Sequence, residues 1–168
     1  KIGLKKNSLF SNQSGAKQDS IKNFCAKLVK AKKAKVSDDM LIIARIESFI
    51  LGKSLNDAVN RAEAYSKAGA DAILIHSKEK NPNLIFKFAK RFRKSKFYKP
   101  MVAVPSTYSR TSEKDLIKNG FKIVIYANHM LRAAYPAMVK IAKNILKNQR
   151  SYESEKDITS IKEILTLI

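Results

Sequence analysis

Polar residues suited to holding an anion follow four short apolar runs of the sequence. They are Arg45 and Glu47 after the first run, His76 after the second, Ser106 and Thr107 after the third, and Asn128 and His129 after the fourth. Guanidinium, imidazole, hydroxyl and amide groups all donate hydrogen bonds to phosphate or carboxylate oxygens. If the fold brings these run ends together, they would form a site for a small anionic substrate.

The apolar runs themselves predict the elements that carry these residues. Residues 41–45, 72–76, 101–105 and 122–127 are continuous, rich in β-branched side chains and typical of fully buried parallel strands. Helical patterns separate them, with Ser54 and Ser112 as N-caps and Gly69 and Gly120 as stops. Strand starts fall roughly 20–30 residues apart, which is typical of βα units. We therefore expect an α/β protein whose strands deliver polar residues to one edge of a parallel sheet.

Two architectures fit this alternation, an open doubly wound sheet and part of a (βα)8 barrel. The sequence contains neither G-x-G-x-x-G nor G-x-x-x-x-G-K-[ST], which disfavours the dinucleotide-binding and P-loop forms of the open sheet. A complete barrel needs about 250 residues, so 168 residues with four βα units would be about half of one. Further helices are expected before the first strand, over 131–148 with Pro136 in its first turn or at a break, and over 158–167.

The charge is strongly positive, with 34 Lys and Arg against 14 Asp and Glu and a net charge of +20. Of these cations 27 are Lys and seven are Arg, and they are scattered along the chain. Lys is a strongly hydrated point charge, whereas Arg supplies bidentate and stacking contacts. We interpret the excess as Lys-rich solvated surface and expect no nucleic-acid partner. A Lys-rich nucleic-acid-binding α/β domain remains the alternative.

Other features of the sequence bear on the membrane partner, the cellular compartment and the metal that we expect. No apolar run reaches the roughly 20 residues of a membrane span, so we expect no membrane partner. The single cysteine, Cys25, excludes an internal disulfide framework and fits a reducing, cytoplasmic compartment. The two histidines have unrelated positions, which disfavours a paired zinc site. Glu47 is the only carboxylate at a strand end, so a hard cation would find most of its ligands elsewhere.

Simpler interpretations of the same residues remain open. Arg45 would then only pair with Glu47, and His76 would orient a loop. Asn128 and His129 would cap the helix that follows them.

Several segments together resemble the phosphoenolpyruvate mutase family. They are I-A-R-I-E at 43–47, R-A-E-A-Y at 61–65, A-G-A-D-A-I-L-I-H-S-K at 68–78, V-P-S-T-Y at 104–108 and I-Y-A-N-H-M-L-R-A-A at 125–134. Residues 1–9 resemble the family's gating loop, E-D-K-x-x-P-K-x-N-S-L, with Lys5, Asn7 and Ser8 at its K, N and S. Leu4 stands at the position of the loop proline.

This resemblance implies a fold and a reaction. The family belongs to the isocitrate lyase superfamily of (βα)8 barrels, which bind Mg²⁺ and act on 2-oxo acids. The implied reaction interconverts phosphoenolpyruvate and phosphonopyruvate, and so serves phosphonate biosynthesis. Phosphonopyruvate hydrolysis, or another 2-oxo-acid reaction of the superfamily, is the alternative. The lyases carry a K-K-C-G type loop, and Lys5-Lys6-Asn7-Ser8 departs from it, which disfavours C–C cleavage.

The resemblance also implies roles for individual residues. Arg45 would hold the phosphoryl or carboxylate group, and His76 would donate a hydrogen bond to the transferring group or the enolate. Lys5, Asn7 and Ser8 would arrive on the gating loop, close over the substrate and exclude water. Glu47 and Asn128 would contact these side chains, rather than the substrate, and hold them in position.

The resemblance finally implies an organisation in which this chain is the C-terminal half of the barrel. We expect a gating loop at 1–20, βα units at 21–150 and a C-terminal helical segment at 151–168. The metal-binding aspartates are expected upstream of Lys1, so the chain alone should lack mutase activity. Its sheet would have two unpaired edges, and the full-length enzyme is expected to be a homo-oligomer. A half-barrel that has lost catalysis is a further alternative.

Overall fold

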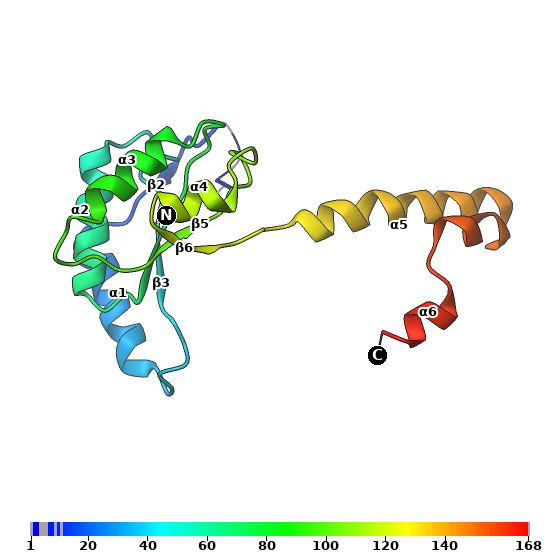
Figure 1. Ribbon diagram of the computed structural model, residues 1–168, viewed down its shortest axis with the longest axis horizontal. Coiled ribbons are helices and arrows are strands. Elements are labelled where there is room, and N and C mark those ends of the chain that lie inside the picture. Colours follow the sequence, from blue (N-terminus) through cyan, green and yellow to red (C-terminus); the bar gives the residue numbers. More distant parts are fainter. Residues whose placement is uncertain (1, 4–6, 9, 11, 168) are drawn as a thin grey trace. The chain divides into compact units, whose positions relative to one another are not determined.

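A computed structural model describes residues 2–3, 7–8, 10 and 12–167 (Figure 1). The chain divides into two compact units, one reaching Tyr126 and one beginning at Ala127. The first holds the sheet and most of the residues of interest, and each unit is described by itself.

The first unit is built on a parallel sheet in the order β3-β4-β5-β6. Its strands are β3 (Ile43–Ile46), β4 (Ala72–Ile75), β5 (Met101–Ala103) and β6 (Phe121–Val124). The connecting helices are α2 (Leu55–Lys67), α3 (Asn83–Phe92) and α4 (Glu113–Lys118), and α1 (Ile21–Ala34) precedes β3. The predicted order of helix and strand is confirmed, and α1, α2 and α3 pack side by side (Figure 1).

Burial differs between the central and the outer strands. All residues of β4 and β5 are buried, whereas Ile43 and Arg45 of β3 and Lys122 of β6 are exposed. The expectation of four fully buried strands is therefore wrong for β3 and β6. Each of these has a paired neighbour on one side only among the described residues. The two strands also lie at Ile43–Ile46 and Phe121–Val124, rather than at 41–45 and 122–127.

An aromatic cluster fills the space between the sheet and its helices. The Phe88 ring lies 6.4 Å from the Phe49 ring and 5.5 Å from the Phe92 ring, measured between centroids. Phe88 and Phe92 are fully buried, and aromatic pairs at such separations contribute beyond their burial alone. Because Phe49 lies in the turn after β3, the core fixes the backbone that carries Glu47.

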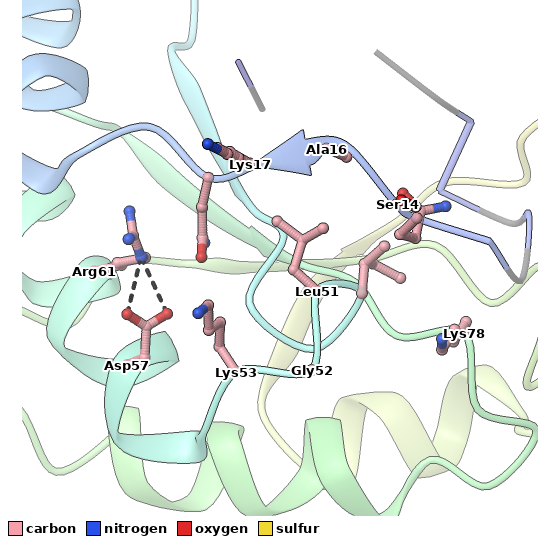
Figure 2. Close-up of a pocket in the computed structure, with 12 residues that line it drawn as sticks. Ser14, Ala16, Lys17, Leu51, Gly52, Lys53, Asp57, Arg61 and Lys78 are labelled. Carbon is pink, nitrogen blue, oxygen red and sulfur yellow. Dashed lines mark hydrogen bonds and ion pairs between the residues drawn. The ribbon is translucent and has the colours of Figure 1, made fainter. Parts of the chain in front are cut away.

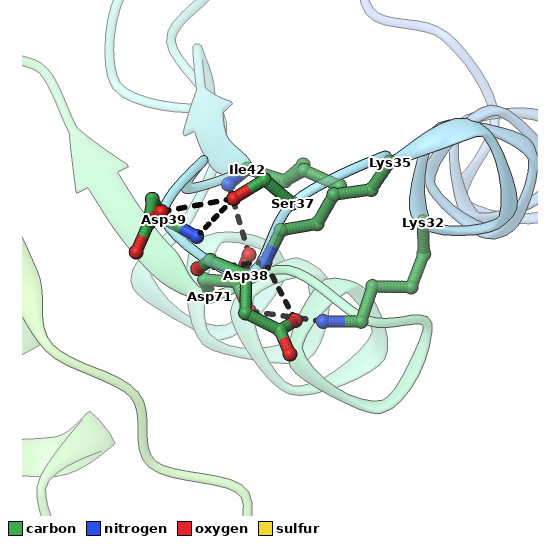
Figure 3. Close-up of polar contacts among 7 residues, drawn as sticks. All are labelled: Lys32, Lys35, Ser37, Asp38, Asp39, Ile42 and Asp71. Atoms are coloured by element: carbon green, nitrogen blue, oxygen red, sulfur yellow. Dashed lines mark hydrogen bonds and ion pairs between the residues drawn. The ribbon is translucent and has the colours of Figure 1, made fainter.

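The starts of β3 and β4 are joined by a carboxylate (Figure 3). Asp71 accepts hydrogen bonds from the Ile42 backbone N–H at 2.9 Å and from Lys32 Nζ at 3.4 Å. The Ile42 bond, followed by the nearby Lys32 charge, lowers the pKa of Asp71 below its ordinary value despite partial burial. This contact sets the register in which the two strands run toward their polar ends.

The second unit consists of α5 (His129–Asn148), the 3₁₀ helix η1 (Tyr152–Asp157) and α6 (Ile161–Leu165). Pro136 lies inside α5, so the expectation of a first-turn position or a break is wrong. The helix already begins at His129 and continues past the proline, although proline has no N–H to donate to the preceding turn. The helix expected over 158–167 is limited to Ile161–Leu165. Across the described stretches of the chain, no helix is both long and apolar enough to span a membrane.

Candidate functional site

Three side chains meet at the carboxyl end of β3. The Ser8 hydroxyl donates to Glu47 Oε2 at 2.7 Å, and Arg45 Nη2 donates to the Ser8 oxygen at 3.1 Å. Arg45 Nε donates to the other carboxylate oxygen of Glu47. Glu47 is 8% exposed, whereas Arg45 is exposed. The site therefore presents a guanidinium to solvent that is oriented by a buried carboxylate.

The alternative in which Arg45 pairs with Glu47 is thus correct as a contact. The Glu47 pair does not use all the donors of Arg45, because its guanidinium also donates to Ser8 on the N-terminal segment. A guanidinium held along one edge keeps other N–H groups available for a second set of oxygens. The geometry is compatible with both a structural pair and an anion clamp.

His76 leaves the neighbouring strand at the same level as Glu47. The parallel register pairs Ile46 with Ile75, so the next residue of each strand stands at the sheet's carboxyl edge. His76 is 3% exposed and Ser77 is 1% exposed. The Thr107 hydroxyl, from the loop after β5, donates to the Ser77 carbonyl at 2.9 Å. Three of the four predicted strand ends therefore lie at one edge of the sheet.

The N-terminal segment that carries Asn7 and Ser8 folds on itself before it reaches α1. The Asn7 carbonyl accepts from the Gln13 side chain at 2.9 Å and from the Phe10 N–H at 3.2 Å. Strand β1 (Ile2–Gly3) pairs antiparallel with β2 (Ala16–Lys17), which closes the segment as a loop. Asn7 is exposed next to Ser8. Lys5, the third residue predicted on this loop, lies outside the described residues.

Asn128 lies in the second unit, where it immediately precedes α5. Its backbone is left-handed, with φ of 56°, and its side chain makes no capping hydrogen bond. The simpler interpretation, in which Asn128 caps the helix, is correct for its position, since it is the N-cap residue and its carbonyl accepts from the Arg132 N–H at 2.9 Å; its side chain does not contribute. His129 is the first residue of α5 rather than its cap. A role for Asn128 behind the Arg45 site stays a prediction.

Sequence reasoning missed a second polar cluster beneath the N-terminal segment. Arg61 of α2 is only 9% exposed and donates through Nε to Asp57 Oδ2 at 3.1 Å. Asp57 also accepts from the Ser48 hydroxyl at 2.7 Å. The spacing of Asp57 and Arg61, four apart on one helix face, was the available signal. Such spacing is common on solvated helices, so it did not indicate burial.

A cavity of about 780 Å³ adjoins this cluster (Figure 2). It lies between residues 13–18 of the N-terminal segment and residues 50–53 after β3. Lys17, Lys53 and Lys78 contribute positive charge to its wall (Figure 2). Gln18 lines both this cavity and a smaller pocket against Arg45 and Glu47. The larger cavity and the Arg45 site are thus neighbours separated by one side chain.

A magnesium site does not assemble from these residues. Within the described ranges, no three His, Cys, Asp or Glu side chains gather closely enough to hold a metal ion. Glu47, the carboxylate at the rim, has both oxygens engaged by Ser8 and Arg45. Mg²⁺ would require further oxygen ligands around it. The described residues therefore do not make up a magnesium centre.

Comparisons with known proteins agree with this picture. The sequence model of the family described as phosphoenolpyruvate phosphomutase matches residues 5–146. The phosphoenolpyruvate phosphomutase of Tetrahymena pyriformis is 36% identical over 169 residues, covering 99% of this chain and 54% of the relative. The phosphonopyruvate hydrolase of Variovorax sp. (strain Pal2) is 38% identical over 148 residues, covering 88% of this chain and 50% of the relative.

Solved structures match to a similar extent. A phosphoenolpyruvate phosphomutase from Streptomyces platensis subsp. rosaceus superposes with a TM-score of 0.86 at 37% identity, covering 97% of this chain and 55% of that one. A phosphonopyruvate hydrolase in complex with oxalate and Mg²⁺ gives 0.79 at 37% identity, covering 89% and 52%. The predicted fold, about half of a (βα)8 barrel, is confirmed by these matches.

The chain spans about half the length of the curated relatives it matches. Its fold and its sequence both match the same family over most of its length. The chain therefore belongs to the phosphoenolpyruvate phosphomutase family.

Proposed function

We propose that this chain forms part of an enzyme that interconverts phosphoenolpyruvate and phosphonopyruvate. The observation that supports this most is the joining of Ser8 to Arg45 and Glu47 at the end of β3. A loop residue hydrogen-bonded across an arginine closes the space in which a small anion would lie. Both substrates are small and carry several negative charges, which suits a guanidinium at the rim.

The proposed reaction moves one phosphoryl group within one molecule. The bond from phosphorus to the enol oxygen of phosphoenolpyruvate breaks, a bond from phosphorus to C3 forms, and the enolate becomes the ketone of phosphonopyruvate. No proton or water enters the balance. In this scheme Arg45 binds oxygens of the phosphoryl or carboxylate group. His76 donates a hydrogen bond to the transferring group or to the enolate oxygen.

Water exclusion is the second requirement of this scheme. A phosphoryl group in transfer has little bonding to either partner, so water is a competing acceptor. Asn7 and Ser8, with Lys5, form the cover over the substrate. The Ser8 hydrogen bond to Glu47 holds that cover against the strand end. Glu47 thus supports both Arg45 and the loop without touching substrate.

Phosphonopyruvate hydrolysis is the second candidate. The hydrolase from Variovorax sp. is 38% identical to this chain, close to the 36% of the Tetrahymena phosphomutase. The two reactions differ in whether phosphorus is transferred to the enolate oxygen or to water. Asn7 and Ser8 at the loop positions of the mutase family favour isomerisation.

The remaining parts of the proposal concern the enzyme as a whole. We propose that it uses Mg²⁺ held by residues outside this chain, acts in phosphonate biosynthesis in the cytoplasm, and is a homo-oligomer. Residues 1–20 are its gating loop, 21–150 its βα units and 151–168 its C-terminal helical segment. We propose neither a membrane nor a nucleic-acid partner, because the cations are mostly scattered Lys.

The test uses a chimaera in which this chain replaces the matching part of the Tetrahymena pyriformis phosphomutase. With Mg²⁺ and phosphonopyruvate, ³¹P NMR should show phosphoenolpyruvate as the main product. Free phosphate as the main product would contradict isomerisation and assign phosphonopyruvate hydrolysis instead. A chimaera that is folded by circular dichroism yet turns over neither substrate would leave only a non-catalytic half-barrel.

The isolated 168-residue chain provides two further measurements. We expect no turnover of phosphonopyruvate with Mg²⁺, because the described residues assemble no magnesium centre. Appreciable turnover by the chain alone would contradict this. We also expect phosphoenolpyruvate to shift the Nε–H resonance of Arg45 in ¹⁵N NMR, which tests anion binding even if the chimaera does not fold. An unshifted Arg45 resonance at saturating ligand would contradict the clamp.

A further inference from the structure

The two segments that supply Ser8 and Glu47 are both connected to one buried arginine of α2. The segment with residues 7–8, 10 and 12–19 carries Ser8 toward the rim, and the turn after β3 carries Glu47. Arg61 lies beneath both, with its side chain 10% exposed. Figure 2 shows it beside Asp57, below Lys17 of the N-terminal segment.

The first connection reaches the end of the N-terminal segment. Arg61 Nη1 donates to the Asp19 carbonyl at 2.8 Å and to the Tyr65 hydroxyl at 2.9 Å. Asp19 is 5% exposed, and its carboxylate accepts from Lys27 Nζ at 2.6 Å. The Lys27 hydrogen bond lowers the pKa of Asp19, which therefore remains charged at neutral pH. The point where the segment enters α1 is thereby fixed against α2.

The second connection reaches the turn that carries Glu47. Arg61 Nε lies 3.2 and 3.1 Å from the two carboxylate oxygens of Asp57. Asp57 accepts from the Ser48 hydroxyl at 2.7 Å, and Ser48 directly follows Glu47 with no exposed surface. The Gln18 side-chain amide lies 3.1 Å from the same hydroxyl, so the two connections also meet at Ser48.

We propose that Arg61 is a positioning residue that sets the separation between the Ser8-bearing segment and the Glu47-bearing turn. Its planar guanidinium directs N–H groups toward a carboxylate, a backbone carbonyl and a phenol oxygen at once. A lysine ammonium lacks this fixed fork. An exposed Asp–Arg pair four residues apart would only support its own helix, by about 0.3–0.5 kcal/mol. Here Arg61 is buried and Asp57 is half-buried, and Arg61 Nη1 donates to the Asp19 carbonyl outside the helix.

Arg61 therefore influences how stably the segment that carries Ser8 is held against the strand end that carries Glu47. The Ser8–Glu47 hydrogen bond requires its two segments to remain at contact distance, although each approaches from a different part of the fold. Loss of Arg61 removes the tie on both sides while leaving Ser8, Arg45 and Glu47 intact. This expected change in the positions of the two segments follows from the contacts alone. Its effect on turnover rests on the proposed function.

Hydrogen exchange of the 168-residue chain tests the positioning role without any assay of activity. We expect Arg61→Lys to raise amide exchange in residues 12–19 and 48–51 by about tenfold or more, with less than about twofold change in β4 and β5. Tyr65→Phe, which removes only one acceptor, should give a smaller rise confined to 12–19. Unchanged exchange, or an equal rise throughout the sheet, would overturn the proposal.

The matched control is Arg91→Ala. Arg91 of α3 also bonds α2, through the side chain of Asn56, but no hydrogen bond connects it to the N-terminal segment among the described residues. Its loss should leave exchange in residues 12–19 within about twofold of the unaltered chain. An equal rise from Arg91→Ala would mean that any disturbance of α2 loosens the segment, which contradicts a specific role for Arg61.

The chimaera then separates positioning from simple stabilisation. Because the cover excludes water, Arg61→Lys should raise the ratio of free phosphate to phosphoenolpyruvate formed from phosphonopyruvate by about tenfold, with KM changed less than about threefold. A fall in total turnover at an unchanged product ratio would assign Arg61 a structural role only. If the unaltered chimaera is folded but inactive, the proposed function fails, and the exchange experiment still decides the positioning role.

Discussion

The Ser8 hydroxyl donates a 2.7 Å hydrogen bond to the carboxylate of Glu47, which lies 39 residues further along the chain. Glu47 is largely buried, and the same carboxylate also binds Arg45. One acidic side chain therefore orients both the exposed guanidinium of Arg45 and the N-terminal segment that carries Ser8. Substitution of Glu47 would therefore disturb both the Arg45 side chain and the segment that carries Ser8.

This dual contact predicts coupled effects of two substitutions in the chimaera. Ser8→Ala and Glu47→Gln should each lower kcat by about ten- to a hundredfold, because each frees the loop from the rim. The kcat of the double variant should be only slightly lower than that of the worse single variant, since both substitutions remove the same Ser8–Glu47 contact. A double-mutant cycle on kcat measures this. Ser14→Ala, an exposed serine of the same segment, is the control, and fully additive effects would contradict the contact.

His76 should matter for turnover more than for stability. His76→Asn keeps a donor of similar size but moves it away from the substrate, so we expect kcat to fall by about a hundredfold. The melting temperature of the isolated chain should drop by only a few degrees. His129→Asn, at the chain's other histidine, should leave kcat within about twofold. Equal loss of kcat in both variants would contradict a specific role for His76.

Asp71 predicts an acid-dependent part of the stability. The Ile42 N–H and Lys32 hold its folded pKa below the ordinary value, so its contribution is present above the unfolded pKa. That contribution is lost as the pH falls from about 4 through the lowered folded pKa. Asp71→Ala should cost about 1–2 kcal/mol in urea unfolding at pH 7. The difference from the unaltered chain should shrink toward low pH.

The control for Asp71 is Asp38→Ala, in the same loop system (Figure 3). The Asp38 side chain is fully exposed and meets only Lys35, so its removal should change the unfolding free energy by less than about 0.5 kcal/mol. A difference between unaltered and Asp71→Ala chains that stays constant with pH would contradict the predicted linkage.

Tyr108 predicts the opposite behaviour at alkaline pH. Burial raises the pKa of Tyr108 to about 12, while its oxygen accepts the Val104 N–H at 3.2 Å. Because the folded pKa lies above the unfolded value of about 10, this stabilisation is complete below pH 10 and is lost as the pH rises to about 12. Unfolding curves should show Tyr108→Phe losing less stability than the unaltered chain between about pH 10 and pH 12. Equal losses would contradict a buried neutral tyrosine.

The order of strands and helices could be predicted from the sequence because each signal is local. Continuous runs such as 72–75 become buried strands, and Ser112 with Asp115 forms the capping box at the start of α4. Parallel strands end on the same edge, so the meeting of Arg45, Glu47 and His76 at one rim followed from their positions in the sequence. The resemblance to the family rested on the same local segments.

Exposure of the outer strands and the course of α5 could not be predicted in this way. The pattern of residues 43–46 does not show that Ile43 and Arg45 are exposed, because this depends on which segments pair with β3 and cover it. Pro136 signals a helix boundary on local grounds, yet the helix begins at His129 and continues through it. Strand pairing decides the exposure of β3, whereas among the described residues no buried contact of α5 explains its passage through Pro136.

The sequence by itself determined the α/β class and the polar residues near the ends of β3, β4 and β5, because the spacing of apolar runs along the chain encodes these directly. Its motifs indicated the family by resemblance. Only the tertiary structure placed Ser8 on Glu47 and connected Asp19 and Ser48 through the buried Arg61. These contacts join residues 9 to 42 positions apart in the sequence. No periodic pattern records such pairs, because they form only when the helix α2 and the two turns have packed together.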